Sequence, residues 1–252
     1  MAVRLYVEKR LTKGAAFELG PEQTHYLVHV MRLAARDRVR LFNGRDGEWD
    51  AVIEKQSKKR ILIAPKKCCR PQDTIANLWF LFAPIKRNCI DNLVEKATEL
   101  GVAHLKPVVT ERTETKRINM KRLKAHVIEA AEQTKRLCIP KIDEAKPLEK
   151  VLNDWPSARR LLLCDETGGG PPILEAIVRA GPGEWAILTG PEGGFTRGEL
   201  DALRQLPFVI SASLGPRVLR ADTAAIAALT CWQAVLGDWK KRPNFRFKET
   251  TS

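Results

Sequence analysis

Two stretches near the carboxyl end decide the fold: Trp185-Ala-Ile-Leu-Thr-Gly-Pro-Glu-Gly-Gly-Phe195 and Ser213-Leu-Gly-Pro-Arg-Val-Leu-Arg220. Each contains a loop rich in glycine and proline, with an apolar run of strand length before it and a helical pattern after it. The predicted strands are residues 185–188 and 208–212, and the predicted helices are residues 196–206 and 221–239. Ligands of open α/β sheets bind at the carboxyl ends of strands. The two loops therefore predict a ligand site.

The composition of these loops narrows the class of ligand. Neither GxGxxG nor GxxxxGK[ST] occurs in the chain, which disfavours a dinucleotide or a nucleoside triphosphate. Glu192, between the glycines, would repel a polyphosphate. A third glycine loop, residues 165–170, follows another predicted buried strand, residues 158–164. Turn formation alone is the simpler alternative reading of these glycines.

The composition of the whole chain favours a nucleic-acid partner. The 252 residues carry a net charge of +13 and a pI near 9.7, and such a field attracts polyanions. An unspecialised basic surface is the alternative. The amino terminus does not resemble a signal peptide, and no apolar run approaches membrane-spanning length. The six cysteines include no CxxC pair, which predicts a reduced cytoplasmic protein without structural zinc or another metal.

Residues 1–72 are predicted to form a small barrel or sandwich that binds RNA. Short alternating runs are typical of strands, and Asn43-Gly44 and Asp46-Gly47 are hairpin signals. The predicted strands are residues 4–8, 38–42, 48–54 and 60–64. One helix is expected over residues 21–33, with His25 and Arg32 away from its apolar face. Basic residues between 55 and 70 suit contacts with an RNA backbone.

After a linker at residues 70–74, strands alternate with helices, which predicts a parallel α/β sheet covered on both faces. An exposed basic loop is expected at residues 110–122. A helix over residues 121–136 would then carry Glu129, Gln133 and Arg136 on one face. That face could line a cleft, although polar stripes are usually solvated.

Five segments together identify the chain as similar to the RsmE-like family, the SPOUT-superfamily methyltransferases of uridine N3 in small-subunit (16S) ribosomal RNA. They are His25-Tyr-Leu with Val30 and Arg32, Glu95-Lys-Ala-Thr-Glu-Leu-Gly-Val102, Glu129-Ala-Ala-Glu-Gln-Thr with Arg136, Gly190-Pro-Glu-Gly-Gly-Phe195, and Leu214-Gly-Pro-Arg-Val-Leu-Arg220 with Thr223-Ala224. Their order and spacing are specific, and they cover nearly the whole chain. The chain departs from the pattern at Glu95, Lys135 and Ala221-Asp222, and Lys135 adds a positive charge beside the expected substrate contacts of residues 129–136.

The resemblance implies an architecture that periodicity does not predict. Residues 1–72 are expected to form a PUA-like β-barrel, residues 73–246 a SPOUT methyltransferase domain with a deep trefoil knot, and residues 247–252 a tail. Chains rarely thread their own loops, so the knot rests on the family alone. The family also implies a cytoplasmic homodimer that acts on 16S rRNA in the 30S subunit, without a membrane. It uses S-adenosylmethionine (SAM), gives S-adenosylhomocysteine as product, and needs no metal.

The resemblance also assigns roles to residues. Because uracil N3 must lose a proton to react, Arg220 and Arg136 are expected to stabilise negative charge on the uracil, with structural ion pairing as the alternative. Glu192, Glu129 and Asp222 are candidate proton acceptors, although the position of Asp222 at the start of the last helix favours a role at the helix dipole. The expected cofactor-binding residues are Leu163, Thr189, Gly190, Pro191, Glu192, Gly193, Gly194, Leu214, Gly215, Val218 and Leu219. The expected RNA-binding residues are His25, Arg32, Arg112, Lys116, Arg117, Glu129, Gln133 and Arg217. Two other functions stay open: methylation of another RNA, such as transfer RNA, and non-catalytic RNA binding by a ribosome assembly factor.

Overall fold

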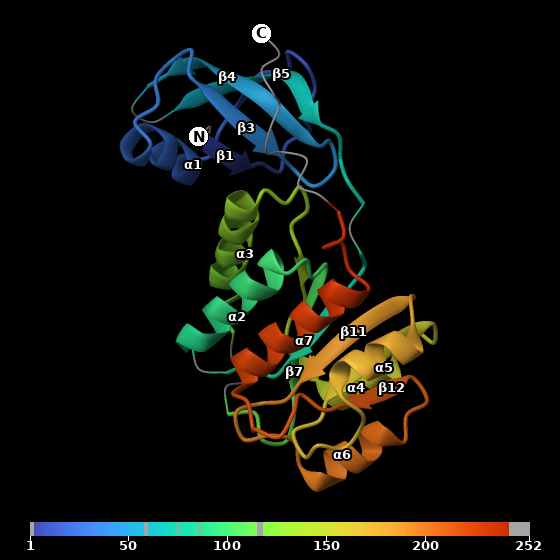
Figure 1. Ribbon diagram of the computed structural model, residues 1–252. Coiled ribbons are helices and arrows are strands. Elements are labelled where there is room, and N and C mark those ends of the chain that lie inside the picture. Colours follow the sequence, from blue (N-terminus) through green and yellow to red (C-terminus); the bar gives the residue numbers. More distant parts are fainter. Residues whose placement is uncertain (1–2, 58–59, 75, 86, 115–117, 242–252) are drawn as a thin grey trace. The chain divides into compact units, whose positions relative to one another are not determined.

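The computed structural model describes residues 3–57, 60–74, 76–85, 87–114 and 118–241. It contains two compact units (Figure 1). The first unit comprises residues 1–74 and 125–139, and the second comprises residues 75–124 and 140–252. Each unit has its own hydrophobic core, so we describe them in turn.

The first unit contains one five-stranded sheet in the order β1-β3-β4-β5-β2. Its strands are β1 (Val3–Tyr6), β2 (Phe17–Glu18), β3 (Arg38–Phe42), β4 (Glu48–Gln56) and β5 (Ile61–Arg70). The predicted hairpin lies between β3 and β4, where Gly44 and Gly47 both have φ of +79°. The described residues thus form a single sheet rather than the two sheets of a sandwich. β5 continues to Arg70, opposite Glu48, so the predicted linker is part strand.

The predicted helix at residues 21–33 is only partly correct. An α-helix, α1 (Pro21–His25), passes into a π-helical turn, η1 (Tyr26–Val30). Met31 N–H bonds to Tyr26 O, five residues back, and Arg32 then adopts φ of +54°, which no right-handed helix allows. The helix therefore ends before residue 33. Leu27 is fully buried in the core of the sheet, as the apolar face of the predicted helix required.

Residues 125–139 pack against the sheet of the first unit, which the sequence did not predict. They include most of α3 (Met120–Thr134). Arg4 on β1 donates to the carbonyls of Ala131 and Glu132, both at 2.8 Å, and forms an ion pair with Glu48 at 2.6 Å. These contacts satisfy carbonyls in the last turn of α3 that lack partners within the helix.

The second unit is built on a seven-stranded sheet whose pairings are all parallel, as predicted. Its main path runs β12-β10-β11-β6-β7-β8, and β9 also pairs with β7. The strands are β6 (Trp79–Phe82), β7 (His104–Val109), β8 (Lys141–Ile142), β9 (Lys146–Pro147), β10 (Arg159–Cys164), β11 (Glu184–Thr189) and β12 (Val209–Ala212). The spatial order of the strands therefore differs from their order in the sequence, and β11 lies between β10 and β6.

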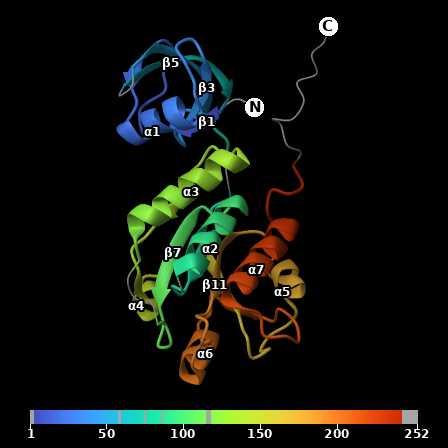
Figure 2. The same ribbon diagram turned by 90° about the vertical axis from the view of Figure 1, so that its left-hand side faces the viewer.

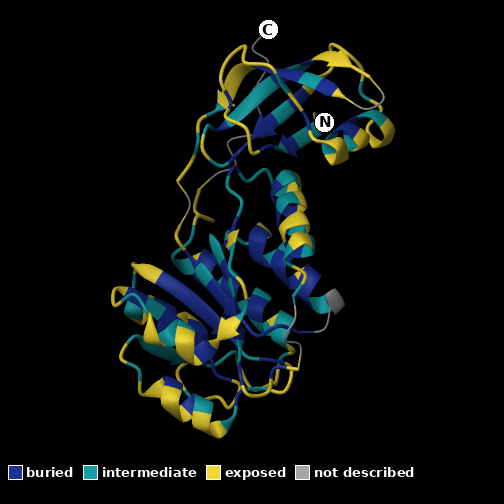
Figure 3. Cartoon of the chain, turned by 180° about the vertical axis from the view of Figure 1, so that it is seen from behind, coloured by how far each residue is buried: buried dark blue, intermediate teal, exposed yellow. Residues whose placement is uncertain are grey.

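Helices cover both faces of this sheet (Figures 1 and 2). On one face, α4 (Leu148–Asn153) and α6 (Arg197–Arg204) share a core with the strands. On the other, α2 (Arg87–Glu99) and α5 (Ile173–Ala180) both pack on α7 (Ala221–Val235), which contacts β11. Figure 3 shows the strands largely buried and the outer side of α6 exposed. The sheet is thus a rigid support whose strand ends carry the loops.

Helix α7 ends at Val235, four residues before the predicted end at residue 239. The side chain of Gln233 accounts for this, because its Oε1 accepts a hydrogen bond from Asp238 N–H and its Nε2 donates to Leu100 O. The residues after Val235 therefore turn towards the side chain of Gln233 instead of continuing the helix. Within the described ranges, no helix is both long and apolar enough to cross a bilayer.

Candidate functional site

A pocket of about 330 Å³ opens at the carboxyl ends of the central strands of the second unit. Cys164 ends β10, Thr189 ends β11, and the loop after β12 together with the first turn of α7 supplies residues 218–222. The pocket is lined by Ile85, Cys89, Cys164, Glu166, Thr189, Gly190, Pro191, Glu192, Gly194, Val218, Leu219, Arg220, Ala221, Asp222 and Ala224. The two loops that the sequence singled out therefore meet around one pocket.

The charges that line the pocket favour a cationic ligand. Among the described lining residues, Glu166, Glu192 and Asp222 carry carboxylates, and Arg220 carries the one positive charge. Asp222 also accepts a hydrogen bond from Thr223 N–H at 2.9 Å in the first turn of α7. Ile85, Val218 and Leu219 supply apolar wall. Such a surface suits a ligand with an apolar body and a positive charge better than a polyphosphate.

The Phe195 ring and the capping box of α6 fix the position of the Gly190–Phe195 loop. The ring of buried Phe195 lies against Gly190, where an added Cβ would come within 2.9 Å of a ring carbon. Thr196 caps α6 by accepting from Glu199 N–H, and Glu199 accepts from Thr196 N–H, which completes a capping box. The glycine thus permits the close packing that fixes the loop at the amino end of α6.

Arg112 forms hydrogen bonds to the backbone of the same loop. Its Nη1 donates to Gly193 O at 3.0 Å and to Phe195 O at 3.4 Å. The sequence predicted Arg112 as an RNA contact, but the structure places its guanidinium on the backbone of the glycine loop. Because a guanidinium has further donors, an RNA contact by Arg112 stays a prediction.

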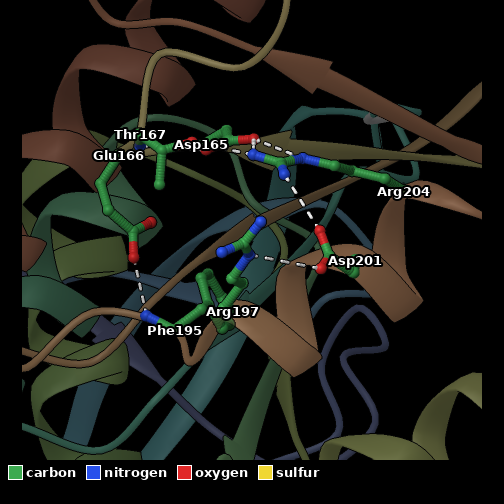
Figure 4. A network of polar contacts seen from close by, with 7 residues as sticks. All are labelled: Asp165, Glu166, Thr167, Phe195, Arg197, Asp201 and Arg204. Carbon is green, nitrogen blue, oxygen red and sulfur yellow. Dashed lines mark hydrogen bonds and ion pairs between the residues drawn. The ribbon is translucent and has the colours of Figure 1, made fainter.

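Glu166 and Asp165, at the start of the third glycine loop, connect that loop to α6 and to the Gly190–Phe195 loop (Figure 4). Glu166 Oε1 accepts from Phe195 N–H at 2.7 Å. Asp165, whose side chain is fully buried, accepts from Arg204 Nη2 at 2.6 Å and from Thr167 Oγ1 at 2.6 Å. Burial alone would raise the pKa of the Asp165 carboxyl, but the hydrogen bonds from Thr167 and Arg204 hold it below its ordinary value.

Seven of the eleven residues predicted to bind the cofactor line the pocket. They are Thr189, Gly190, Pro191, Glu192, Gly194, Val218 and Leu219. Gly193 borders a small neighbouring hollow with Arg112, and Leu214 and Gly215 lie outside the lining. Leu163 is fully buried in the core shared with α4 and α6. Because side chains alternate along a strand, its neighbour Cys164 faces the pocket instead.

The predicted catalytic residues are not all in one unit. Arg220 and Glu192 line the pocket and are exposed, whereas Arg136 belongs to the first unit. Arg136 is also not on the predicted helical face with Glu129 and Gln133. Helix α3 ends at Thr134, and Lys135 turns the chain away with φ of +61°.

The predicted RNA-binding residues are distributed over both units. In the first unit, the rings of His25 and His29 lie tilted to each other with centroids 4.8 Å apart, and Arg32, Glu129 and Gln133 are exposed. In the second unit, Arg217 is exposed on the loop beside the pocket. Lys116 and Arg117 lie outside the described residues. Their roles in RNA binding stay predictions.

Several pocket residues escaped the sequence analysis as ligand contacts, among them Ile85, Cys89, Cys164 and Glu166. Of these four, Cys164 and Glu166 had a signal in the sequence, which is their position at the end of a predicted buried strand. Burial raises the pKa of the Cys164 thiol to about 12, so this thiol is an uncharged part of the wall. In the described part of the chain, no group of three or more His, Cys, Asp or Glu is placed to hold a metal ion.

Comparison with known proteins identifies the family. Residues 72–233 match the RNA methyltransferase domain, and residues 19–66 match the RNA methyltransferase PUA domain. The chain is 34% identical to a ribosomal RNA small subunit methyltransferase E of Rickettsia conorii, over 90% of this chain and 93% of that protein. The chain belongs to the ribosomal RNA small subunit methyltransferase E family. The resemblance drawn from the five sequence segments is thereby confirmed.

Solved structures related to this methyltransferase E family member share its fold over nearly its whole length. A Neisseria gonorrhoeae ribosomal RNA small subunit methyltransferase E bound to S-adenosyl methionine has a TM-score of 0.85 and 25% identity, covering 95% of this chain and all 100% of that one. The Legionella pneumophila protein Lpg2936, in complex with the cofactor SAM, has a TM-score of 0.84 and 28% identity. That match covers 94% of this chain and 99% of the other.

Proposed function

We propose that this protein transfers the methyl group of SAM to N3 of a uridine in 16S ribosomal RNA within the 30S subunit. The observation that carries the proposal is the pocket itself, which residues 189–194 and 218–222 form together at the strand ends. Two relatives with the same fold were solved with SAM bound, and the curated relatives are named for the small-subunit rRNA. The target uridine N3 rests on the RsmE-like family.

The described residues fit SAM. Small-molecule sites typically measure about 300–1,000 Å³, and this pocket is about 330 Å³. The three carboxylates complement the sulfonium and ammonium charges of the cofactor, and Ile85, Val218 and Leu219 give apolar surface for its adenosine part. When bound, SAM supplies an electrophilic methyl group, whose transfer to N3 breaks the sulfur–carbon bond and leaves that electron pair on a neutral thioether.

The pocket residues include a base and a cation, which methylation of uracil N3 requires. N3 of uracil carries a proton at neutral pH, so a base must accept that proton before N3 becomes nucleophilic. Exposed Glu192 is the proposed acceptor, and Arg220, just before α7, would stabilise the negative charge on the uracil edge. A positioned base contributes roughly 10²- to 10⁴-fold, whereas alignment of the reacting atoms lowers the barrier by about 7–11 kcal/mol. Alignment of N3 with the methyl group by the rigid loops should therefore contribute more to the rate than the proton acceptor does.

The remaining features of the proposal rest on the family. We propose that the loops of the second unit are threaded as a deep trefoil knot and that the protein acts in the cytoplasm as a homodimer. Arg136, in the first unit, is proposed as a second cation at the uracil. Within the first unit, the PUA domain match supports an RNA-binding role for the exposed residues His25, Arg32, Glu129 and Gln133.

Two measurements test the proposed function. Isothermal titration calorimetry should detect SAM binding to the wild-type protein, and nucleoside mass spectrometry should detect 3-methyluridine after incubation with 30S subunits that lack the modification. Failure to bind SAM would favour the non-catalytic assembly factor. Methylation of transfer RNA but not of 30S subunits or 16S rRNA would favour the other enzymatic reading.

Substitution of Arg220 tests its catalytic role. Arg220→Ala should lower the methylation rate constant by about 10²-fold, since it removes charge stabilisation in the transition state, while RNA affinity falls little. Arg197→Ala is the matched control, because Arg197 is 97% exposed on α6 and outside the pocket lining. Equal losses of rate and RNA affinity in Arg220→Ala would reduce Arg220 to a phosphate contact.

A further inference from the structure

Glu166 is the one lining carboxylate that the structure also ties to the glycine loop opposite it. It lies in the third glycine loop, which follows β10, whereas Glu192 lies in the Gly190–Phe195 loop and Asp222 lies in the first turn of α7. Its Oε1 accepts the hydrogen bond from Phe195 N–H at 2.7 Å. One side chain therefore joins two walls of the pocket.

The two walls approach each other closely at Gly194. Gly194 has φ of +68°, and a Cβ at this position would lie 2.6 Å from Glu166 Oε1. The left-handed backbone favours glycine here, and a side chain at this position would also force the Glu166 carboxylate to move. The sequence of the Gly190–Phe195 loop is thus adapted to the carboxylate of Glu166.

Neighbouring contacts hold Glu166 in place. Asp165 is anchored to α6 by Arg204 and to its own loop by Thr167, which donates from both its N–H and its hydroxyl group. In Figure 4 the Glu166 carboxylate has one oxygen on Phe195 N–H and its second oxygen turned away from that contact. Among the described residues, this second oxygen has no hydrogen-bond partner within the protein. The negative charge of the side chain is thus presented at the pocket wall.

This charge distinguishes the two forms of the cofactor. SAM carries a sulfonium, so its net charge is one unit more positive than that of S-adenosylhomocysteine, in which the sulfur is a neutral thioether. A fixed carboxylate at the wall attracts the sulfonium form and offers the thioether no comparable interaction. The apolar walls contact both forms alike.

We infer that Glu166 is a specificity-determining residue, which makes the pocket prefer the cationic methyl donor to its neutral product and so favours product release after transfer. The inference rests on the proposed function, because it takes SAM to be the ligand. Glu166 acts here through its charge, which is separable from its hydrogen bond. A glutamine at this position retains a side-chain oxygen that accepts from Phe195 N–H and removes the charge.

Calorimetry with SAM and with S-adenosylhomocysteine tests the inference in three proteins: wild type, Glu166→Gln and Glu175→Gln. Glu175 is an exposed residue of α5 outside the pocket lining, so its variant removes the same charge elsewhere. For Glu166→Gln we expect SAM affinity to fall about three- to tenfold, with less than about a twofold change for S-adenosylhomocysteine. Glu175→Gln should change neither affinity by more than about twofold.

The outcomes separate this inference from the proposed function. Wild-type protein that binds SAM, together with a Glu166→Gln variant that loses affinity equally for both ligands, would overturn the charge preference and leave the enzyme assignment intact. Unchanged SAM affinity in Glu166→Gln would overturn it as well. Wild-type protein that binds neither ligand would remove the proposed function itself. Circular dichroism melting of each variant checks that the fold is retained.

Discussion

Arg204 of α6 donates two hydrogen bonds to a single carboxylate oxygen of Asp165, at 3.0 Å from Nε and 2.6 Å from Nη2. The Asp165 side chain has no exposed surface, whereas that of Arg204 is 35% exposed. The pair joins α6 to the loop that carries Glu166 (Figure 4). It therefore connects the packing of one sheet face with the geometry of the pocket.

Removal of Arg204 should destabilise the protein. Arg204→Ala leaves the Asp165 carboxylate buried without its cation, and we expect the free energy of unfolding to fall by about 2–3 kcal/mol at pH 7. Urea denaturation followed by circular dichroism measures this change. Arg197→Ala on the same helix is the matched control, because its ion pair with Asp201 is long, at 3.9 Å, and solvent-exposed. That control should stay within about 0.5 kcal/mol of wild type. Equal effects of the two substitutions would contradict a special role for the buried pair.

The stability difference between wild type and Arg204→Ala should depend on pH. The folded protein holds the pKa of Asp165 below its ordinary value, so the stabilisation is complete above about pH 4 and is lost as the pH falls towards the lowered pKa. In Arg204→Ala, burial without the cation instead favours protonation of Asp165. Urea midpoints measured from pH 7 downwards should therefore converge below about pH 4. A difference that stays constant over this range would show that the two residues contribute through packing alone.

Gly194→Ala should disturb both stability and ligand binding. The new methyl group would meet Glu166 Oε1 and the backbone would keep a left-handed φ, so we expect a loss of about 1–3 kcal/mol and weaker SAM binding. Gly14→Ala is a control for the backbone alone, since Gly14 has φ of +78° and no heavy atom within 4 Å of the added Cβ. Gly14→Ala should lower stability but leave SAM affinity unchanged. Full SAM affinity in Gly194→Ala would show that the contact between the loops does not shape the pocket.

Local pattern predicted most of the second unit. The apolar runs that end at Cys164, Leu188 and Ala212 correspond to β10, β11 and β12, and the loops after them do meet at one pocket. Buried strands have a strong signal because most of their side chains are apolar in an unbroken run, and glycines after a strand mark the turn. The existence of the site therefore followed from residues close together in the chain.

The contacts that shape the site did not follow from local pattern. Arg204 meets Asp165 over a separation of 39 residues, and Arg112 meets Gly193 over 81. A lone arginine in a basic sequence looks the same whether it faces RNA, as predicted for Arg112, or a backbone carbonyl. Tertiary packing alone decides between these roles.

The first unit shows the same limit. Arg4 contacts the carbonyl of Glu132 across 128 residues, so no local pattern indicates that residues 125–139 pack against the sheet. The positive φ of Lys135, which removes Arg136 from the predicted helical face, is equally invisible, because lysine is an ordinary helix former. Helix boundaries of this kind depend on distant partners such as Arg4.

The strand order β12-β10-β11-β6 has a consequence for synthesis of the protein. The pocket takes residues from Ile85 to Ala224, so a nascent chain that has emerged only as far as residue 200 lacks one of its walls. Translation must therefore be nearly complete before the small molecule has anywhere to bind. Ligand binding can then stabilise only chains whose fold is complete. Truncated chains lack that stabilisation and its protection against proteolysis.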